Sequence, residues 1–300
     1  MSGPALVTRG LTKYYGSQRG IEDVDLDIAR GEVFGFLGPN GAGKTTALRT
    51  VMGLLRPTRG TIEVLGLDVA ADGIAARRRT GYLSGELALY PGLTGGQTCR
   101  FVADMRGGLP DSAYTSLAAR FDLDLERQVS DLSKGNRQKL GIVLSFLHSP
   151  DLLLLDEPTS GLDPLVQQEF HALVRETVAR GATVCLSSHV LAEVELMADR
   201  VGIVDDGRLL VVETVDGLKS RAVRRLALTF PAHPPEAALR GVPGVSDVAV
   251  TGPVARCAVA GAVTDLLRVA VDHGVVDVHS EEADLEEIFL GLLRDEAMQP

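Results

Sequence analysis

The pattern of apolar and polar positions predicts which parts of the chain form strands and which form helices. Residues 5–37 hold short alternating stretches typical of strands, and a Gly-rich turn leads from them into helical spacing. Residues 75–148 follow a helical pattern that Gly- and Pro-rich turns interrupt. Between residues 150 and 213, apolar runs alternate with helical segments at 164–180 and 190–200 and end in a hairpin. This order predicts an α/β fold with a mainly parallel core sheet, antiparallel strands and a helical subdomain.

The character of this pattern changes near residue 218. Beyond that point, "RRLALTF", "VSDVAVTG" and "VARCAVAG" predict short strands, and residues 262–274 and 284–293 predict helices. We therefore expect two domains, which also suits a length of 300 residues. The predicted limits are 1–218 for the first domain, with a core at 1–83 and 150–218 and a helical subdomain at 84–149, and 219–300 for a small C-terminal α/β domain.

Composition narrows the classes of function. Hydrophobic residues make up 45% of the chain and charged residues 23%, which is typical of a globular protein. A net charge of -10, 4% aromatic residues and no Trp argue against a nucleic-acid partner, because phosphate backbones attract basic surfaces. No apolar run reaches the roughly 18 residues that a membrane span needs, so we expect a chain that does not cross a membrane. The three cysteines fit no metal spacing or disulfide framework, and we expect them to be small buried side chains.

A Gly-rich loop carries the clearest chemical signal. The stretch "GPNGAGKTT" fits the pattern G-x-x-x-x-G-K-[ST], follows a predicted strand and opens a predicted helix. Backbone N–H groups in such a loop, together with the helix N-terminus, bind phosphate groups. We therefore predict a nucleoside triphosphate site in which Lys44 reaches the β- and γ-phosphates and the Thr45 hydroxyl ligates Mg²⁺. The predicted nucleotide-binding residues of the loop are Gly38, Asn40, Gly41, Ala42, Gly43, Lys44, Thr45 and Thr46.

Two predicted strand ends carry polar side chains that fit the same chemistry. Four leucines precede Asp156 and Glu157, and such an apolar run is typical of a strand buried on both faces. Ligands of α/β sheets bind at the carboxyl ends of strands, so we expect Asp156 to hold Mg²⁺ and Glu157 to polarise the attacking water. His189 follows the strand "TVCLSS", where it either caps the next helix or contacts the γ-phosphate. Without the phosphate loop, each of these residues would also suit a structural role.

The order of five motifs resembles the ATP-binding cassette (ABC) family, the ATPase subunits of ABC transporters. The motifs are "GPNGAGKTT", the signature turn "LSKGN", "LLLLDEP", the turn "SGLD" at residues 160–163, and "SSH", which ends at His189. The resemblance covers about residues 4–218. It implies the fold of a P-loop NTPase cassette, binding and hydrolysis of ATP with Mg²⁺, and a role for His189 at the γ-phosphate.

The resemblance also implies a purpose for the signature turn, which looks inert within one chain. In this family two cassettes bind head to tail, and the signature turn of one closes over the ATP held by the other. Ser133 would cap the following helix, with its hydroxyl and the N–H of Gly135 directed at the partner's γ-phosphate. Lys134 and Asn136 complete the signature.

Two further residues match the family individually. Tyr15 in "KYYG" corresponds to the aromatic side chain that stacks on adenine, although a half-buried strand tyrosine would look the same. Asp163 in "SGLD" corresponds to the residue that links the two ATP sites across the dimer. We expect the second cassette to be another copy of this chain.

Two departures from the family pattern bear on activity. The usual signature is LSGGQ, and here Lys134 replaces the first Gly and Asn136 the Gln. The second departure is Gly85, at a position where the family commonly has a Gln that touches Mg²⁺ and the attacking water. Glycine has no side chain to ligate anything. Either Glu86, Ser84 or a water takes its place, or hydrolysis is slow.

The type of cassette follows from two stretches. "EVFGFLGPNGAGKTT" and the tail "DLEEIFLGLL" resemble ABC-2-type exporters, including daunorubicin-resistance-like drug efflux ATPases. The resemblance implies a peripheral subunit on the cytoplasmic side of the membrane that powers a separate permease and exports a drug-like, lipid or hydrophobic compound. Two alternatives stay open at this stage: a soluble ABC ATPase that acts on ribosomes or DNA, and a regulatory cassette with little hydrolysis.

Overall fold

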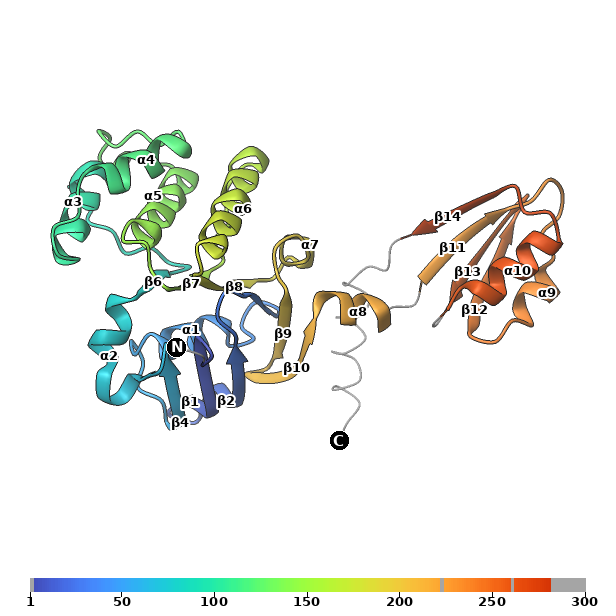
Figure 1. The fold of residues 1–300 in the computed structure, drawn as a ribbon, viewed down its shortest axis with the longest axis horizontal. Coiled ribbons are helices and arrows are strands. Elements are labelled where there is room, and N and C mark those ends of the chain that lie inside the picture. Colours follow the sequence, from blue (N-terminus) through green and yellow to red (C-terminus); the bar gives the residue numbers. More distant parts are fainter. Residues whose placement is uncertain (1–2, 222–223, 260–261, 282–300) are drawn as a thin grey trace. The chain divides into compact units, whose positions relative to one another are not determined.

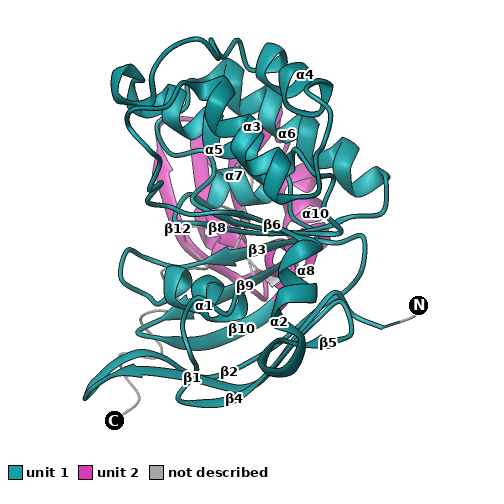
Figure 2. Cartoon of the chain, turned by 90° about the vertical axis from the view of Figure 1, so that its left-hand side faces the viewer, with its two compact units in different colours: residues 1–212 teal, residues 213–300 magenta. Residues whose placement is uncertain are grey.

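The computed structural model divides the chain into two units, residues 1–212 and residues 213–300 (Figure 2). The structure describes residues 3–221, 224–259 and 262–281. Each unit has a hydrophobic core of its own. The finer limits given above for the domains and for the helical subdomain stay a prediction.

Unit 1 contains a four-stranded antiparallel sheet in the order β2-β1-β4-β5 (Figure 1). Its strands are β1 (Leu6–Tyr15), β2 (Gln18–Ile28), β4 (Arg59–Val64) and β5 (Leu67–Asp68). Along β2, buried and exposed residues alternate from Val24 to Ile28, so that Val24, Leu26 and Ile28 all face the core. This period of two places one face of the sheet on the core and the other in solvent.

A six-stranded sheet forms the centre of unit 1, in the order β10-β9-β3-β8-β7-β6. Its strands are β3 (Val33–Leu37), β6 (Thr80–Leu83), β7 (Leu152–Asp156), β8 (Thr183–Ser188), β9 (Arg200–Asp205) and β10 (Arg208–Thr214). Strands β6, β7, β8, β3 and β9 pair in parallel, which confirms the predicted core sheet. Every residue of β3, β7 and β8 is buried, and for this reason the leucine run in β7 shows no alternation.

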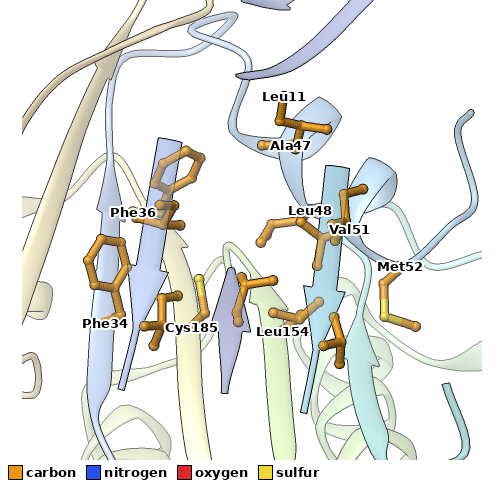
Figure 3. Close-up of a cluster of buried hydrophobic side chains, with 14 of the residues drawn as sticks. Leu11, Phe34, Phe36, Ala47, Leu48, Val51, Met52, Leu154 and Cys185 are labelled. Carbon is orange, nitrogen blue, oxygen red and sulfur yellow. The ribbon is translucent and has the colours of Figure 1, made fainter. Parts of the chain in front are cut away.

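Helix α1 (Lys44–Val51) shares one hydrophobic core with both sheets. Figure 3 shows Ala47 and Leu48 of this helix between Leu11 of the antiparallel sheet and Cys185 of the parallel sheet. Because the phosphate loop leads directly into α1, this packing holds the loop at a fixed place relative to the carboxyl ends of the parallel strands.

Helices between β5 and β7 follow most of the predicted helical pattern. They are α2 (Val69–Arg78), α3 (Gly95–Met105), α4 (Ser112–Arg120), the short 3₁₀ helix η1 (Val129–Asp131) and α5 (Lys134–Phe146). Helices α3, α4 and α5 lie together at one end of unit 1 (Figure 1). The helical pattern predicted over 75–148 is wrong at Thr80–Leu83, which forms β6. Four residues are too few to display a period, and pairing with β7 decides their conformation.

Two helices follow β7 and β8. Helix α6 (Pro164–Ala179) has Pro at its first turn and is capped by Asp163, as its sequence favours. Helix α7 (Leu191–Glu195) is shorter than the helix predicted over 190–200. Beyond this helix, Oδ2 of Asp199 accepts a hydrogen bond of 2.8 Å from the Val33 N–H at the start of β3, and β9 begins at Arg200.

Unit 2 contains an antiparallel sheet in the order β12-β13-β11-β14. Its elements are α8 (Val215–Arg221), β11 (Arg224–Thr229), α9 (Glu236–Arg240), β12 (Val245–Thr251), β13 (Val254–Val259), α10 (Thr264–Asp272) and β14 (Asp277–Glu281). From β11 to β14 the order is β-α-β-β-α-β, the split βαβ arrangement. The predicted strands and the first predicted helix are present, whereas α9 and β14 were not predicted. The helix predicted at 284–293 lies outside the described residues.

Two predictions made from composition, on the cysteines and on membrane spans, can be compared with the structure. All three cysteines are buried free thiols, as predicted, and burial raises the pKa of Cys99 and of Cys185 to about 12. Among the helices that the structure describes, none combines the length and the apolar character that a membrane crossing requires.

Candidate active site

The phosphate loop joins β3 to α1 and forms one wall of a cavity of about 410 Å³. The cavity is lined by Tyr15, Gln18, Arg19, Gly20, Asn40, Gly41, Ala42, Gly43, Lys44, Thr45, Thr46 and Glu157. Gly43 has a φ of 101°, in the left-handed region, and a Cβ there would collide with the carbonyl oxygen of Gly20. At Gly38, a Cβ would collide with the carbonyl oxygen of Val204. Both positions therefore need glycine, which explains the spacing of the motif.

Lys44 supplies a buried cation of the cavity. Its side chain is buried, and Nζ donates to the carbonyl oxygens of Gly38 at 2.6 Å and Pro39 at 3.1 Å. Nζ also lies 3.5 Å from Oε1 of Glu157. These partners compensate a charge that would otherwise be costly to bury. The ammonium group is thus held between the phosphate loop and the acid predicted to polarise water.

Thr45 and Asp156, the two predicted Mg²⁺ ligands, come from distant parts of the chain and meet at the cavity. The Thr45 hydroxyl donates to Oδ2 of Asp156 at 2.7 Å, and Oδ1 accepts from the Ser187 hydroxyl at 2.6 Å. Asp156 is fully buried at the end of β7. A hydroxyl and a carboxylate are hard oxygen donors, which fit Mg²⁺ because this ion uses few protein ligands and completes its shell with phosphate and water oxygens.

Glu157 turns out of the sheet toward the cavity. Its φ of 49° lies in the left-handed region, which a non-Gly residue adopts only when its surroundings hold it there. The Glu157 N–H donates to the Ser187 hydroxyl at 3.0 Å, and its carbonyl oxygen accepts from Nε2 of Gln138 at 3.1 Å. These contacts hold the carboxylate in the cavity wall, where Oε2 lies 2.7 Å from Nδ1 of His189.

His189 follows β8 and pairs with Glu157 through Nδ1. The alternative interpretation of this residue as a helix cap is wrong, because α7 begins after Val190 and no side chain caps it. The imidazole is 47% exposed. Contact with the γ-phosphate stays a prediction.

Tyr15 lies in the cavity wall, and stacking of adenine on its ring stays a prediction. Its side chain is 47% exposed, and its hydroxyl lies 3.5 Å from Oγ1 of Thr46. The Lys13 ammonium sits 5.4 Å from the ring centroid. Asn40, an exposed residue of the phosphate loop, lies in the same wall, whereas the predicted residue Gly38 is outside the cavity lining.

An ion-pair network borders the cavity beside Arg19, a residue that sequence reasoning missed. Glu22 accepts hydrogen bonds from Arg208 at 2.9 Å, from Tyr14 at 2.8 Å and from Arg19 at 3.4 Å. The bonds from Arg208 and Tyr14 hold the pKa of Glu22 at about 2. Glu22 is therefore an anion at neutral pH and keeps the Arg19 guanidinium against the cavity wall.

The signature residues lie outside the lining of the cavity in their own chain. Ser133 caps α5 as predicted, since its hydroxyl accepts a hydrogen bond of 3.2 Å from the Asn136 N–H. Ser133 and Lys134 are exposed, as is Asp163. The two turns are neighbours, because a Cβ at Gly135 would lie 2.9 Å from the carbonyl oxygen of Gly161. The structure thus groups the residues predicted to face a partner.

Ser187 and Gln138 are site residues that sequence reasoning missed. Ser187 is aligned with Asp156 in the parallel pair of β8 with β7, and its hydroxyl donates to the Asp156 carboxylate and accepts from the Glu157 backbone N–H. Gln138 reaches from α5 to the carbonyl oxygens of Glu157 and Pro158 at 3.1 and 2.9 Å. A serine pair closing an apolar strand was the available signal for Ser187, whereas nothing in the local sequence pointed to Gln138.

Gly85 adjoins the predicted Mg²⁺ ligand. A Cβ at this position would lie 3.1 Å from Oδ2 of Asp156 and 3.4 Å from its Cγ. A longer side chain here would therefore stand beside the predicted metal site, as the family resemblance implies for Gln. Glu86 does not take that place: its carboxylate is 94% exposed and pairs with Arg49 at 3.9 Å.

We expect Gly85→Gln to raise the rate of ATP hydrolysis several-fold, because an amide beside Asp156 orients the attacking water. Steady-state phosphate release measures this effect. Gly85→Ala is the control, since it adds the crowding against Asp156 without the amide, and it should be no faster than the wild type. If Gly85→Gln hydrolyses ATP no faster than the wild type, the missing side chain at Gly85 does not slow hydrolysis, and this prediction is contradicted.

Comparisons with known proteins agree with this geometry. The family model described as ABC transporter matches residues 21–160. The daunorubicin resistance ATP-binding protein DrrA3 of Streptomyces coeruleorubidus is 41% identical over 225 residues, which cover 73% of this chain and 71% of that protein. The bacitracin transport ATP-binding protein BcrA of Bacillus licheniformis is 38% identical, with 71% of each chain covered. The probable multidrug ABC transporter ATP-binding protein YbhF of Escherichia coli (strain K12) is also 38% identical, but the chain spans only 37% of its length.

A solved structure of an ATP binding subunit of an ABC transporter shares the fold. It superposes with a TM-score of 0.67 at 35% identity, covering 72% of this chain and 92% of that one. These relatives are transporter subunits, so they do not favour a ribosome- or DNA-associated ATPase. The resemblance seen in the sequence and the predicted cassette fold are both confirmed. The chain therefore belongs to the ABC transporter family, as one of its ATP-binding cassettes.

Proposed function

We propose that this chain is the ATPase subunit of an exporter, working at the cytoplasmic face of a membrane as a dimer of identical chains and driving a separate permease. The observation that carries the proposal is the cavity that joins Lys44, Thr45 and Glu157, while the signature turn lies outside it. Relatives named for daunorubicin resistance and bacitracin transport support a drug-like, lipid or hydrophobic compound as the cargo.

In the proposed reaction, a water molecule attacks the γ-phosphorus of ATP. The bond from this phosphorus to the β–γ bridging oxygen breaks, ADP leaves, and Glu157 accepts the proton of the water. Lys44 balances the negative charge that develops on the γ-phosphate oxygens, and His189 donates a hydrogen bond to the same group. Thr45 and Asp156 would hold Mg²⁺, which would supply further positive charge beside the phosphates.

The second copy of the chain is proposed to complete the ATP site. In the closed dimer, the Ser133 hydroxyl and the Gly135 N–H contact the γ-phosphate bound by the partner. Helix α5 begins at this point, and its N-terminus adds partial positive charge toward the phosphate. Asp163, in the adjacent turn, links this contact to the other site. Hydrolysis removes the γ-phosphate that bridges the two chains, and the dimer reopens.

The permease is proposed to dock on an apolar cavity of about 530 Å³ next to α3. The cavity is lined by Tyr90, Pro91, Gly92, Leu93 and Phe101. The rings of Tyr90 and Phe101 meet edge to face with centroids 6.2 Å apart, yet they remain 63% and 46% exposed. Exposed aromatic surface of this kind marks a protein contact. Since the segment runs on directly from Gly85, a permease helix seated here would sense the metal side of the ATP site.

We expect Phe101→Glu to separate the chain from its permease, because the substitution places a charge in an apolar contact. The measurement is co-purification of the tagged chain from membranes, with the multi-span partner identified by mass spectrometry. Ile74→Glu is the control, since Ile74 is 68% exposed and lies outside the cavity lining. The basal ATP hydrolysis of both purified variants should stay unchanged. Retention of the partner by Phe101→Glu would contradict this docking site.

A further inference from the structure

The carboxylate of Glu193 joins the two strand ends that carry the proposed catalytic pair. Oε2 of Glu193, in α7, accepts a hydrogen bond of 2.7 Å from the Thr159 hydroxyl. The same oxygen accepts a bond of 3.1 Å from the Ser188 hydroxyl. Both hydroxyl residues are buried, with 4% of Thr159 and 1% of Ser188 exposed. Buried hydroxyl groups need partners, and one oxygen of one carboxylate serves both.

The two hydroxyl groups belong to segments that adjoin Glu157 and His189 in the chain. Thr159 lies in the turn that follows Glu157 at the end of β7. Ser188 ends β8 and directly precedes His189. Glu193 therefore ties the segment after Glu157 to the segment that carries His189, beside the contact of 2.7 Å between His189 Nδ1 and Glu157 Oε2.

Packing fixes the helix that supplies Glu193. Val194, the next residue of α7, is fully buried, and a Cβ at Gly35 of β3 would collide with its side chain. The close approach of β3 sets the depth of α7 on the sheet. The Val190 N–H donates to the Ser188 hydroxyl at 2.9 Å, which fixes the turn that contains His189. Apolar packing and hydrogen bonds thus hold this turn from two sides.

We propose that Glu193 is a positioning residue for ATP hydrolysis, which holds His189 and Glu157 in register through Ser188 and Thr159. Glu193 does not touch the nucleotide; it acts through the two strand ends. Without it, α7 stays on the sheet through Val194, but the turn carrying His189 is free to move relative to Glu157. This inference rests on the proposed roles of Glu157 and His189.

The test compares variants that keep or remove the acceptor oxygen. Glu193→Ala is expected to lower kcat about tenfold to a hundredfold with KM for ATP little changed, because a displacement of about 1 Å in a catalytic pair has costs of this size. Glu193→Gln keeps an oxygen in the same place and should retain most of the activity. At the other end of the contact, Thr159→Val should lower kcat while Thr159→Ser should not.

Combining the variants tests whether the residues act as one unit. The double variant Thr159→Val with Glu193→Ala should lose no more activity than Glu193→Ala alone, since both remove the same tie. Histidine NMR signals give a readout that general destabilisation would not produce. In Glu193→Ala the His189 resonance should shift or broaden, while those of His233, His273 and His279 in unit 2 stay in place.

The outcomes separate this inference from the proposed function. If Glu157→Gln is inactive and Glu193→Ala matches the wild type, Glu193 is not a positioning residue, although the proposed reaction stands. If Glu157→Gln itself stays active, the proposed reaction fails first. Equal losses in Glu193→Gln and Glu193→Ala would also overturn the inference, because a retained acceptor oxygen would then have no value.

Discussion

Glu157→Gln is expected to lower ATP turnover by roughly 10²- to 10⁴-fold, the range that a positioned general base contributes. The amide fills the same space and keeps the backbone bonds to Ser187 and Gln138, because those bonds use the N–H and carbonyl groups of residue 157. It cannot accept a proton from water. ATP should therefore still bind, and the variant should accumulate as an ATP-bound dimer because the step that reopens the dimer is blocked.

Phosphate release and size-exclusion chromatography with Mg-ATP measure these two effects on the same samples. Glu63→Gln provides a matched control, since Glu63 is an exposed acid on β4 and lies outside the cavity lining. It should resemble the wild type in both assays. Turnover in Glu157→Gln close to that of the wild type would show that another group activates the water. If neither protein turns over ATP nor forms a dimer, the isolated chain needs its permease, and Gly85 becomes the first position to examine.

The parts of the site that the sequence predicted are those whose conformation is set locally. Gly38 and Gly43 leave no room for a side chain, so the loop pattern carries its geometry with it. The leucines of β7 must be buried on both faces, which places Asp156 and Glu157 at a strand end inside the molecule. In both cases a short stretch of sequence can adopt only one conformation, and that conformation also fixes where the functional residues lie.

The parts that could not be predicted depend on pairing between distant segments. Ser187 reaches Asp156 because β8 pairs with β7 in a particular register, and no local pattern fixes that register. The contact of Thr159 with Glu193 joins two turns that meet only after both strands are in the sheet. Strand β6 is too short to show a pattern of apolar and polar positions, so its pairing with β7 determines its conformation. Local sequence therefore identifies many of the functional residues, whereas contacts between distant segments determine how these residues are positioned.

Lys44→Ala is expected to weaken ATP binding by about a hundredfold, in contrast to Glu157→Gln. Lys44 is the buried cation of the cavity, 3.5 Å from Glu157. Its removal leaves the acids and the incoming triphosphate to repel one another. Losing hydrogen bonds to a charged group costs about 1.5–3 kcal/mol each, and about 3 kcal/mol corresponds to roughly a hundredfold in Kd. Turnover should fall with binding, since no step can proceed without bound ATP.

Thermal unfolding with and without Mg-ATP distinguishes loss of binding from loss of chemistry. A ligand at a hundred times its Kd stabilises a protein by about 2.7 kcal/mol, so wild type and Glu157→Gln should both gain melting temperature with ATP while Lys44→Ala gains little. Lys139→Ala is the control, because Lys139 lies on α5 outside the cavity lining. An ATP-induced shift in Lys44→Ala equal to that of the wild type would mean that the loop N–H groups bind the phosphates without this cation. Lys44 would then act only on the charge that develops during hydrolysis, and its variant should resemble Glu157→Gln.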